Sequence, residues 1–400
     1  MSDTTVLVAG ASIAGPALAH WLHRRGAAVT VVERAPGLRP GGQAVDARGV
    51  AKEVIRRMGL DAEVRAARTE TAGAYTVDAN GTVLETFRAE DNDGDGYIAD
   101  IEILRGDLSR VLHDDTRDGV DYIFGDRIAA LTQDANGVDV TFESGDRRRF
   151  DLVIGADGLH SSLREMVFGP HERFVRHLGL ALAFYSVPNE FELDRWLIDC
   201  QEPGRSAGLR PIQDATRALA IFSFTAADLD VDYRDIEAQK RLLRERMSGM
   251  GWLTPRILAH LDDTPDFYLD QVAQVIMDRW STGRVGLLGD AAFSSSPMSG
   301  QGTGLALVGA YLLAGELAAA GWDPEAGFTA YEARMRSFVE ANQEIGRLHA
   351  HSLATPAPDS EPTAEPEWDL ELIDRAINGI ELPDYAELPD LRAPAGTPTT

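Results

Sequence analysis

A glycine-rich turn near the start of the chain has the residue types and spacing of a phosphate-binding loop. In the run Gly10-Ala11-Ser12-Ile13-Ala14-Gly15, the first and last glycines allow a tight reversal and close packing of a helix on a strand. Ser12 stands where a middle glycine is usual, and it is small enough for a phosphate to approach. Roughly 20 residues later comes Glu33, a residue type that accepts hydrogen bonds from a ribose. The spacing predicts a dinucleotide site without separating NAD from FAD.

Two later segments also place a carboxylate after an apolar strand. Asp157 follows the run 151–156, and Gly289-Asp290 follows the run 285–288. Ligands of open α/β sheets bind at the carboxyl ends of the strands, so both aspartates are candidate ligand contacts. The run Gly300-Gln301-Gly302 then precedes an apolar helix, whose first amides and dipole favour a negatively charged group.

The elements that must position these residues begin with a β-α-β unit. An apolar run at 6–9, the glycine turn, a helical pattern at 13–25 and a second apolar run at 28–33 occur in that order. The strand at 285–288 returns to the same style. We therefore predict a discontinuous nucleotide-binding domain over 1–173 and 280–322.

The middle of the chain has a different pattern. Residues 174–279 are mostly β-rich runs with one polar helix, which predicts an inserted substrate-binding domain. Asn80-Gly81 lies between two β-prone runs and predicts a hairpin, which the sequence order places in the first domain.

The C-terminal part predicts a long helix and a short one. Asp323 and Pro324 form a helix start, and apolar residues then recur at spacings of three and four over 323–353. This seam favours a helix that packs across both domains of its own chain over a dimeric coiled coil. Residues 354–400 are predicted to contain a linker, a short amphipathic helix and a tail.

Composition excludes several classes of protein. The chain has 38 basic and 64 acidic residues and a net charge of −26, which disfavours a nucleic-acid partner. A single cysteine, Cys200, fits a reducing cytoplasm. No signal-peptide pattern is present, and the apolar stretch 302–321 is rich in Gly and Ala and carries Glu316, which indicates a buried helix and no stable membrane anchor. The oligomeric state stays open, with a monomer among the alternatives.

In sequence order, these motifs resemble the class A FAD-dependent aromatic hydroxylases, the p-hydroxybenzoate hydroxylase-like monooxygenases. The segment 151–164 is similar to that family's Asp-Gly motif, and 283–302, which includes Pro297, is similar to its second flavin motif. The tetracycline-inactivating branch is nearest in length and loop pattern. The resemblance implies an α/β fold, with a Rossmann-type FAD-binding domain, an inserted β-sheet substrate domain and a long C-terminal helix. It also implies FAD as cofactor.

The resemblance also assigns roles to side chains. Asp290 is expected on the ribityl chain of FAD, and Arg105 is expected to reach the same region. Glu33 and Arg34 belong to the adenosine end. Asp46, in the loop after two glycines, is expected to contact the flavin.

Contacts with the reductant and the substrate are also expected. Arg39 and Arg48 are candidates to meet NADPH, NADH or substrate. Phe293 stands where the family often has histidine, so no imidazole role is carried over. The candidates for the wall of the substrate pocket are Phe184, Tyr185, Leu209, Arg210, Phe222 and Phe224. Arg210, on an apolar strand end, is the candidate to hold a substrate oxyanion.

The implied reaction is a monooxygenation in which NADPH or NADH reduces FAD and O2 then forms a flavin C4a-hydroperoxide. Its distal oxygen passes to a small polycyclic aromatic or polyketide-like molecule, a class that includes antibiotics. The flavin carries this chemistry, so no protein nucleophile and no metal are expected. One alternative is an FAD-dependent reductase or dehydrogenase of a double bond, similar to geranylgeranyl reductases. Ranked below it is a non-catalytic FAD-fold binding protein.

Overall fold

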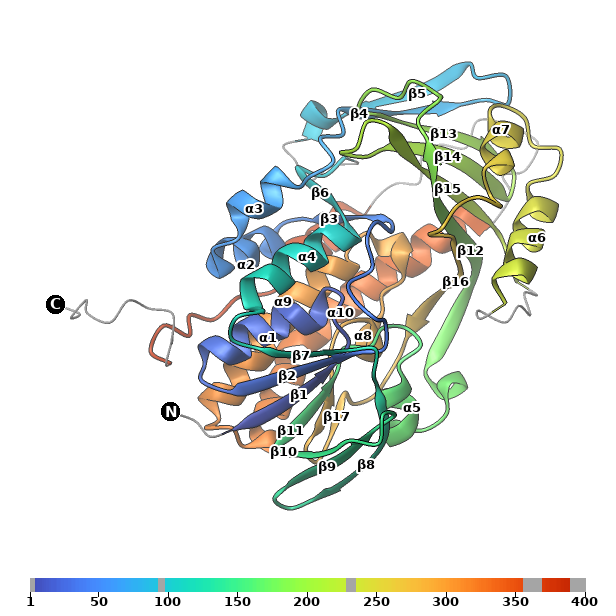
Figure 1. Cartoon of the computed structure of the whole chain (residues 1–400). Coiled ribbons are helices and arrows are strands. Elements are labelled where there is room, and N and C mark those ends of the chain that lie inside the picture. Colours follow the sequence, from blue (N-terminus) through green and yellow to red (C-terminus); the bar gives the residue numbers. More distant parts are fainter. Residues whose placement is uncertain (1–3, 93–97, 228–234, 355–368, 389–400) are drawn as a thin grey trace.

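The computed structural model of the chain describes residues 4–92, 98–227, 235–354 and 369–388, and Figure 1 shows its two β-sheet regions. In the first, a six-stranded sheet has the order β17-β18-β11-β1-β2-β7. Its strands are β1 (Thr5–Ala9), β2 (Ala28–Glu33), β7 (Asp121–Phe124), β11 (Leu152–Gly155), β17 (Ser281–Thr282) and β18 (Val285–Leu287). All pairs are parallel except β17 with β18. Such a sheet is buried on both faces, which is why its central strands are nearly continuous apolar runs.

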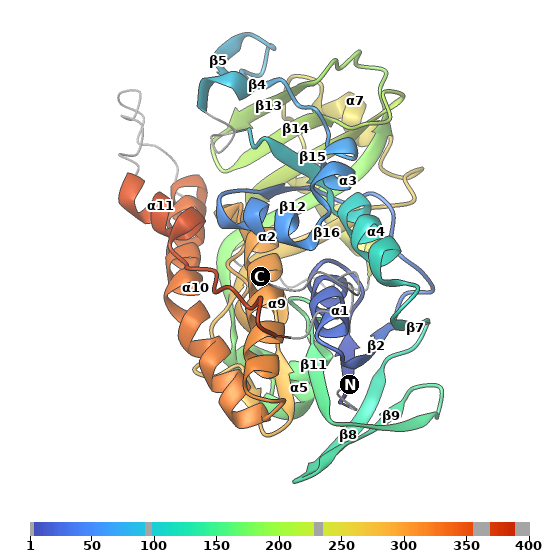
Figure 2. The ribbon, with the colours of Figure 1, turned by 90° about the vertical axis from the view of Figure 1, so that its left-hand side faces the viewer.

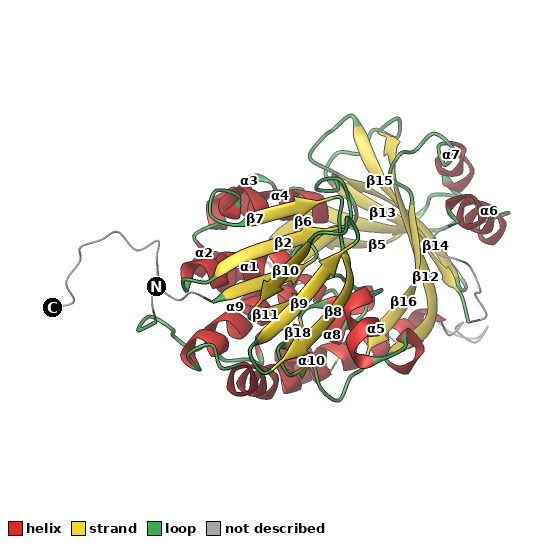
Figure 3. Cartoon of the chain, turned by 60° about the horizontal axis from the view of Figure 1, so that its bottom comes forward, coloured by secondary structure: helices red, strands yellow, loops and turns green. Residues whose placement is uncertain are grey.

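Helices and a small sheet cover this parallel sheet (Figures 1 and 3). The helices of this region are α1 (Ala14–Arg24), α2 (Val50–Met58), α3 (Asp61–Ala66), α4 (Arg105–Thr116), α5 (Ser162–Phe168), α8 (Asp290–Phe293) and α9 (Gly302–Ala319). A three-stranded antiparallel sheet contains β8 (Ile128–Asp134), β9 (Gly137–Phe142) and β10 (Arg147–Phe150), and a two-stranded sheet contains β3 (Ala44–Ala47) and β6 (Ile101–Leu104). Apolar residues of all these elements share one core.

The second region is a seven-stranded sheet with the order β16-β12-β15-β14-β13-β4-β5. Its strands are β4 (Gly73–Val77), β5 (Val83–Arg88), β12 (Val175–Pro188), β13 (Trp196–Glu202), β14 (Arg205–Pro211), β15 (Arg217–Thr225) and β16 (Tyr268–Val275). Helices α6 (Ile236–Arg246) and α7 (Thr254–Ala259) cover the face that lies away from the parallel sheet (Figure 3).

The placement of residues 73–88 differs from the prediction. The hairpin at Asn80-Gly81 forms, since β4 and β5 pair in antiparallel fashion, but β4 also pairs with β13. Both strands therefore extend the second sheet, although they were assigned to the first domain. Sequence order could not show this, because β4 finds its partner more than a hundred residues later in the chain.

A long helix, α10 (Pro324–Ala354), joins the two regions. The Asp323 carboxylate accepts a hydrogen bond from the Ala326 amide at 2.8 Å, as expected of a helix start. The predicted seam is buried; it consists of Phe328, Tyr331, Met335, Phe338, Asn342 and Ile345. Helix α10 contacts both α9 and β12, so it packs against both regions of its own chain.

A second, short C-terminal helix, α11 (Leu370–Asn378), packs on α10, and the chain then passes over α9 and α2 as far as residue 388 (Figure 2). The predicted linker over 355–368 and the last part of the predicted tail lie outside the described residues. Within the described ranges, α9 alone has the length and hydropathy of a membrane span. However, 83% of that window is buried inside the fold, so burial in the core accounts for its composition.

Four short elements complete the described structure: the 3-10 turns η1 (Ala89–Asn92), η2 (His171–Arg173) and η3 (Pro297–Ser299), and the β-bridge between Arg68 and Ile103. Of these, η3 matters most for the candidate site, because it leads into the first turn of α9.

Candidate FAD-binding site

The three sequence motifs meet at one edge of the parallel sheet. They follow β1, β11 and β18, which are adjacent and parallel, so their carboxyl ends lie together. A Cβ placed on Gly10 would lie 3.1 Å from the Cα of Asp157, and one placed on Gly289 would lie 3.1 Å from the Cβ of Ala14. The fold therefore joins segments separated by about 280 residues of chain into one site, in the arrangement that dinucleotide-binding sheets use.

The first loop has the geometry its glycines predict. Gly10 has a φ of +108°, and its amide donates to the carbonyl of Val32 at 2.7 Å. A Cβ on Gly15 would lie 1.9 Å from the carbonyl oxygen of Gly10, so only glycine lets α1 pack this closely on the turn. No side chain caps the start of α1. Its first amides are therefore available to a phosphate.

Glu33 lies at the end of β2 and shapes this loop. Its two carboxylate oxygens accept hydrogen bonds from the amides of Ala11 and Ala35, both at 2.9 Å. Each oxygen keeps a second lone pair with which a ribose hydroxyl can bond. The neighbouring Arg34 is exposed.

Arg105, the first residue of α4, connects the first loop to residues 41–46, which are predicted to contact the flavin and are called the flavin loop below. Its Nη1 donates to the Oγ of Ser12 at 3.0 Å, and a Cβ on Gly42 would lie 3.2 Å from its Nε. Burial lowers the pKa of the Arg105 guanidinium, as does the nearby charge of Arg39, while Glu33 and Asp290 act in the opposite direction. The arginine thus lies within electrostatic reach of both ends of the predicted cofactor site.

Asp157 caps α5. Its carboxylate accepts from the hydroxyls of Ser161 at 2.5 Å and Ser162 at 3.1 Å, and from the amide of Leu163 at 3.2 Å. Arg164, to which the sequence pattern assigned no role, is buried within the same motif. Arg164 Nη1 donates to the carbonyl of Ala291 at 2.9 Å, so it ties the Asp157 segment to the Asp290 segment.

Asp290 and the start of α9 form the other end of the site. Asp290 is exposed, yet surrounding protein displaces enough water to raise the pKa of its carboxyl. A Cβ on Gly302 would lie 4.0 Å from its Oδ1. Pro297 belongs to η3, and Gly300 adopts a φ of +66° before Gln301 and α9. No side chain caps the start of α9. The positive end of the helix dipole therefore lies near Asp290, where it favours a negatively charged group.

Phe293, at the position where the family often has histidine, is buried and packs against Trp280 with 4.7 Å between ring centroids. Phe293 is therefore part of the hydrophobic core.

A buried ionic cluster adjoins the flavin loop. Asp46 and Glu102 lie opposite each other on β3 and β6. Arg48 donates to the Asp46 carboxylate at 2.8 Å, and Arg210 donates to the Glu102 carboxylate. Burial raises the pKa of Asp46. Burial acts in the same direction on Glu102, but Arg210 and two threonine hydroxyls outweigh it and lower its pKa.

The cluster changes the expectations for two arginines. Arg48 is engaged by Asp46, and Arg210 by Glu102, so neither brings an uncompensated positive charge to the site. Arg39 differs, because it is exposed on the loop that packs against the start of α4.

The pocket-wall predictions divide according to the two faces of the seven-stranded sheet. Phe222 and Phe224 point toward α6 and α7, where they are buried with Tyr185 and Leu209. The prediction that they line a substrate pocket was wrong, because side chains alternate along a strand and these lie on the face that the helices cover. Phe184 lies on the opposite face, with Met298 of η3, and its ring stacks at 6.4 Å on Tyr268, which is 48% exposed.

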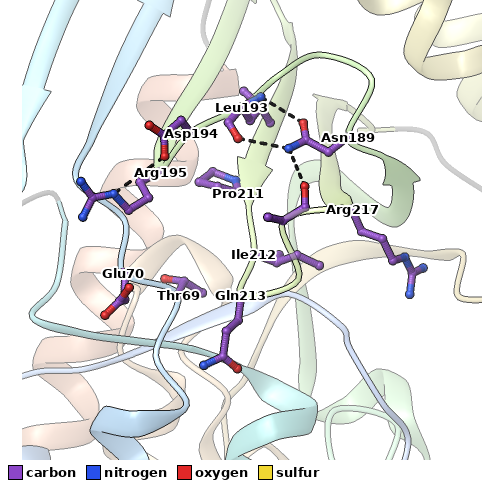
Figure 4. A pocket seen from close by; sticks show the side chains of 11 residues that line it. Thr69, Glu70, Asn189, Leu193, Asp194, Arg195, Pro211, Ile212, Gln213 and Arg217 are labelled. Atoms are coloured by element: carbon purple, nitrogen blue, oxygen red, sulfur yellow. Dashed lines mark hydrogen bonds and ion pairs between the residues drawn. The ribbon is translucent and has the colours of Figure 1, made fainter.

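Two hollows border the far side of the Glu102 cluster. The smaller, of about 130 Å³, lies between the segments 189–195 and 211–217, with Thr69 and Glu70 at its base (Figure 4). The larger, of about 400 Å³, lies along 68–72 and 99–102. Neither is lined by Asp157, Asp290 or the first glycine loop. The hollow in Figure 4 is also smaller than the range usual for ligand pockets.

The cofactor site is divided between two distant segments of the chain. One has a phosphate-binding loop with an acid at the end of β2, and the other has a loop before an uncapped helix; this arrangement defines an α/β flavoprotein. The family model described as "FAD binding domain" matches residues 3–345, and the chain belongs to this family. The predicted fold class and the predicted cofactor FAD are thereby confirmed.

Similar proteins narrow the class. A flavin-dependent monooxygenase of Legionella longbeachae is 38% identical over 95% of this chain and 98% of its own length. An uncharacterized protein of Mycobacterium tuberculosis is 46% identical over 95% of this chain and its full length. The crystal structure of the tetracycline destructase Tet(51) is 37% identical, covers 96% of this chain and all of its own, and superposes with a TM-score of 0.86. The protein is an FAD-dependent monooxygenase of the aromatic hydroxylase type, as predicted.

Proposed function

We propose that this monooxygenase uses NADPH or NADH and O2 to hydroxylate a small polycyclic aromatic or polyketide-like molecule in the cytoplasm. The balanced reaction is R–H + O2 + NAD(P)H + H⁺ → R–OH + NAD(P)⁺ + H2O. One observation carries the proposal: the Asp290 end of the FAD site adjoins, through Met298 of η3, the face of the seven-stranded sheet that lies opposite α6 and α7. A flat substrate bound on that face would lie next to the flavin.

FAD, when bound, supplies the redox and oxygen-transfer chemistry, and the chain supplies binding and orientation. Gly10, Ser12 and the first amides of α1 would hold the pyrophosphate, and Glu33 the ribose. Arg105 and Asp290 would hold the ribityl chain, and the start of α9 the pyrimidine end of the flavin. The residues present fit the cofactor, since their spacing leaves two uncapped helix starts facing it.

The reductant is proposed to approach the exposed Arg39. A guanidinium suits a phosphate through paired hydrogen bonds, and Arg39 lies within electrostatic reach of Arg105. The tetracycline destructase structure supports the choice of substrate class, because its sequence and fold resemble this chain over nearly its whole length.

Purified protein tests the proposal. We expect a yellow protein with flavin absorbance that NADPH or NADH bleaches under anaerobic conditions. A panel of fused-ring phenols should then contain compounds that speed NAD(P)H oxidation and gain one oxygen atom, seen by mass spectrometry. Anaerobic turnover of a substrate double bond, with no oxygen gained, would refute the proposed hydroxylation.

A further inference from the structure

The face of the seven-stranded sheet that lies opposite α6 and α7 carries Asp199 on β13, in addition to Asp270 on β16 and Glu85 on β5, and α10 packs on its β12 side. Asp199 lies in register with Gly208 of β14, Gly208 with Ile221 of β15, and Ile221 with Phe184 of β12. Residues in register share a face, so Asp199 points to the same side as Phe184. The next residue, Cys200, is buried on the other face, toward α6 and α7.

The surroundings of Asp199 leave room for a ligand. A Cβ on Gly208 would lie 3.0 Å from Asp199 Oδ1, so the carboxylate lies over a position with no side chain. Asp199, Ile221, Ser206 and Ser223 are all partly exposed, although they lie within the sheet. A surface that faces the FAD site and keeps its side chains accessible suits a bound substrate.

Asp199 forms no ion pair among the residues that the structure describes. The Nε2 of Gln201 donates to its Oδ2 at 2.8 Å, and within the described ranges no Lys, Arg or His lies at ion-pair distance from it. Arg210 is the nearest charge that acts on it, but its guanidinium is paired with Glu102. Asp46 is paired with Arg48 in the same way, so of these three neighbouring carboxylates Asp199 is the one without an arginine partner.

We propose that Asp199 binds a protonated nitrogen of the substrate, such as an amine carried on a fused-ring phenol. This inference rests on the proposed function and narrows its substrate class. An ammonium group would supply the missing charge, and its carbon skeleton would lie toward Ile221 and Phe184. The net charge of −26 acts in the same sense, since it concentrates cations near the protein. Burial raises the pKa of Asp199 to about 6, so the carboxylate is ionised at neutral pH.

Binding to the FAD-loaded protein tests the inference. The probes are tetracycline, which carries a dimethylamino group, and its 4-dedimethylamino analogue, with the change in flavin fluorescence giving the Kd. We expect Asp199→Asn to weaken binding of the amine probe about tenfold, the effect of one charge-assisted hydrogen bond, and to change the Kd of the analogue far less. Gly208→Ala, which displaces the carboxylate without removing it, should act in the same direction. Asp194→Asn, a matched loss of charge at a side chain that is 93% exposed, should bind both probes as the parent protein does.

The pH dependence provides a second readout. Arg210 is the charged group that acts on Asp199; Glu102 pairs with Arg210, and Asp46 and Arg48 lie beyond that pair. In the parent protein, binding of the amine probe should weaken as the pH falls below about 6, and in Asp199→Asn this step should vanish. Equal loss of both probes in Asp199→Asn, or no loss of either, would overturn the inference. Absence of flavin or of NAD(P)H oxidation would instead count against the proposed function. If flavin and oxidation are retained but neither probe binds, the inference and the fused-ring substrate class both fail.

Discussion

Gly15 shows how much a single position limits this cofactor site. Its missing side chain is what allows α1 to begin against the carbonyl of Gly10, and the amides of that first turn are the ones offered to the pyrophosphate. Gly37 is a contrasting glycine, because a Cβ there would meet no atom within 4 Å.

Gly15→Ala should therefore lose bound FAD, since the new methyl group forces the turn and the helix apart. We expect flavin content per chain, measured by absorbance, to fall by at least about tenfold, equivalent to roughly 1.4 kcal/mol of binding free energy. Gly37→Ala serves as the control and should keep full flavin content. A Gly15→Ala protein as yellow as the parent would show that this close contact is not required.

Asp199 also makes a prediction about stability. Its pKa rises from 3.8 to about 6 on folding, so the folded protein holds the proton more tightly than the unfolded chain does. The free energy of unfolding therefore decreases as the pH rises from 3.8 to about 6. Above about pH 6 the full destabilisation from the buried carboxylate is present.

Asp199→Asn, which cannot ionise, should stabilise the protein by about 1 kcal/mol at pH 7.5, a value reduced for the partial exposure of the side chain. The advantage should shrink below pH 5. Urea unfolding at both pH values measures it. A variant less stable than the parent at pH 7.5 would mean that the carboxylate is satisfied where it lies.

At the scale of elements, the ion pair between Glu102 and Arg210 connects β6 to β14. It therefore joins the two-stranded sheet to the seven-stranded sheet. The side chains of Thr69 and Thr71 also donate to Glu102, at 2.5 and 2.6 Å. A buried carboxylate held in this way is costly to leave without its cation.

Arg210→Met should destabilise the protein by about 3 kcal/mol, because Glu102 stays buried and charged. The double variant with Glu102→Gln should recover part of this loss, since the two residues act as one unit. Arg149→Met, which breaks exposed ion pairs on β10, should cost no more than about 0.5 kcal/mol. Similar costs for the Arg210 and Arg149 variants in urea unfolding would contradict the importance of the buried pair.

Elements also show what the sequence can and cannot predict. The β-α-β unit, the hairpin at Asn80-Gly81 and α10 have local signals, namely glycines at tight turns, a capping aspartate and a helical seam. The face on which Phe222 lies, and the pairing of β4 with β13, depend on strands far apart in the chain. Asp199 had one local signal that could have been used: it alternates with the apolar Cys200 along its strand.

On the scale of the whole molecule, the C-terminal segment holds several elements together. Tyr385 donates to the buried Glu316 at 2.6 Å, Tyr311 donates to the carbonyl of Pro383 at 2.5 Å, and Asn342 donates to the carbonyl of Ala376 at 2.9 Å. These bonds join residues 376–385 to α9 and α10.

Ending the chain after residue 368 should therefore lower the Tm by roughly 5–10 °C, since several buried side chains and their hydrogen bonds are lost together. Leu372→Ala should reproduce part of the loss, because Leu372 is buried against α10. Leu370→Ala, two residues earlier and 75% exposed, should leave the Tm unchanged. Differential scanning fluorimetry compares the three, and equal Tm values for the truncated and full chains would refute the role of this segment.

The joining of residues 10–15 with 289–302 has a consequence for how the enzyme matures. During synthesis, the amino-terminal loop leaves the ribosome long before β18 and α9 exist, so a nascent chain has the phosphate-binding half of the site without the half that holds the flavin ring. FAD can be held firmly only after more than three quarters of the chain has been made. Cofactor loading is thus a late event, and because a ligand stabilises only the state that binds it, FAD supply sets how much finished chain escapes proteolysis.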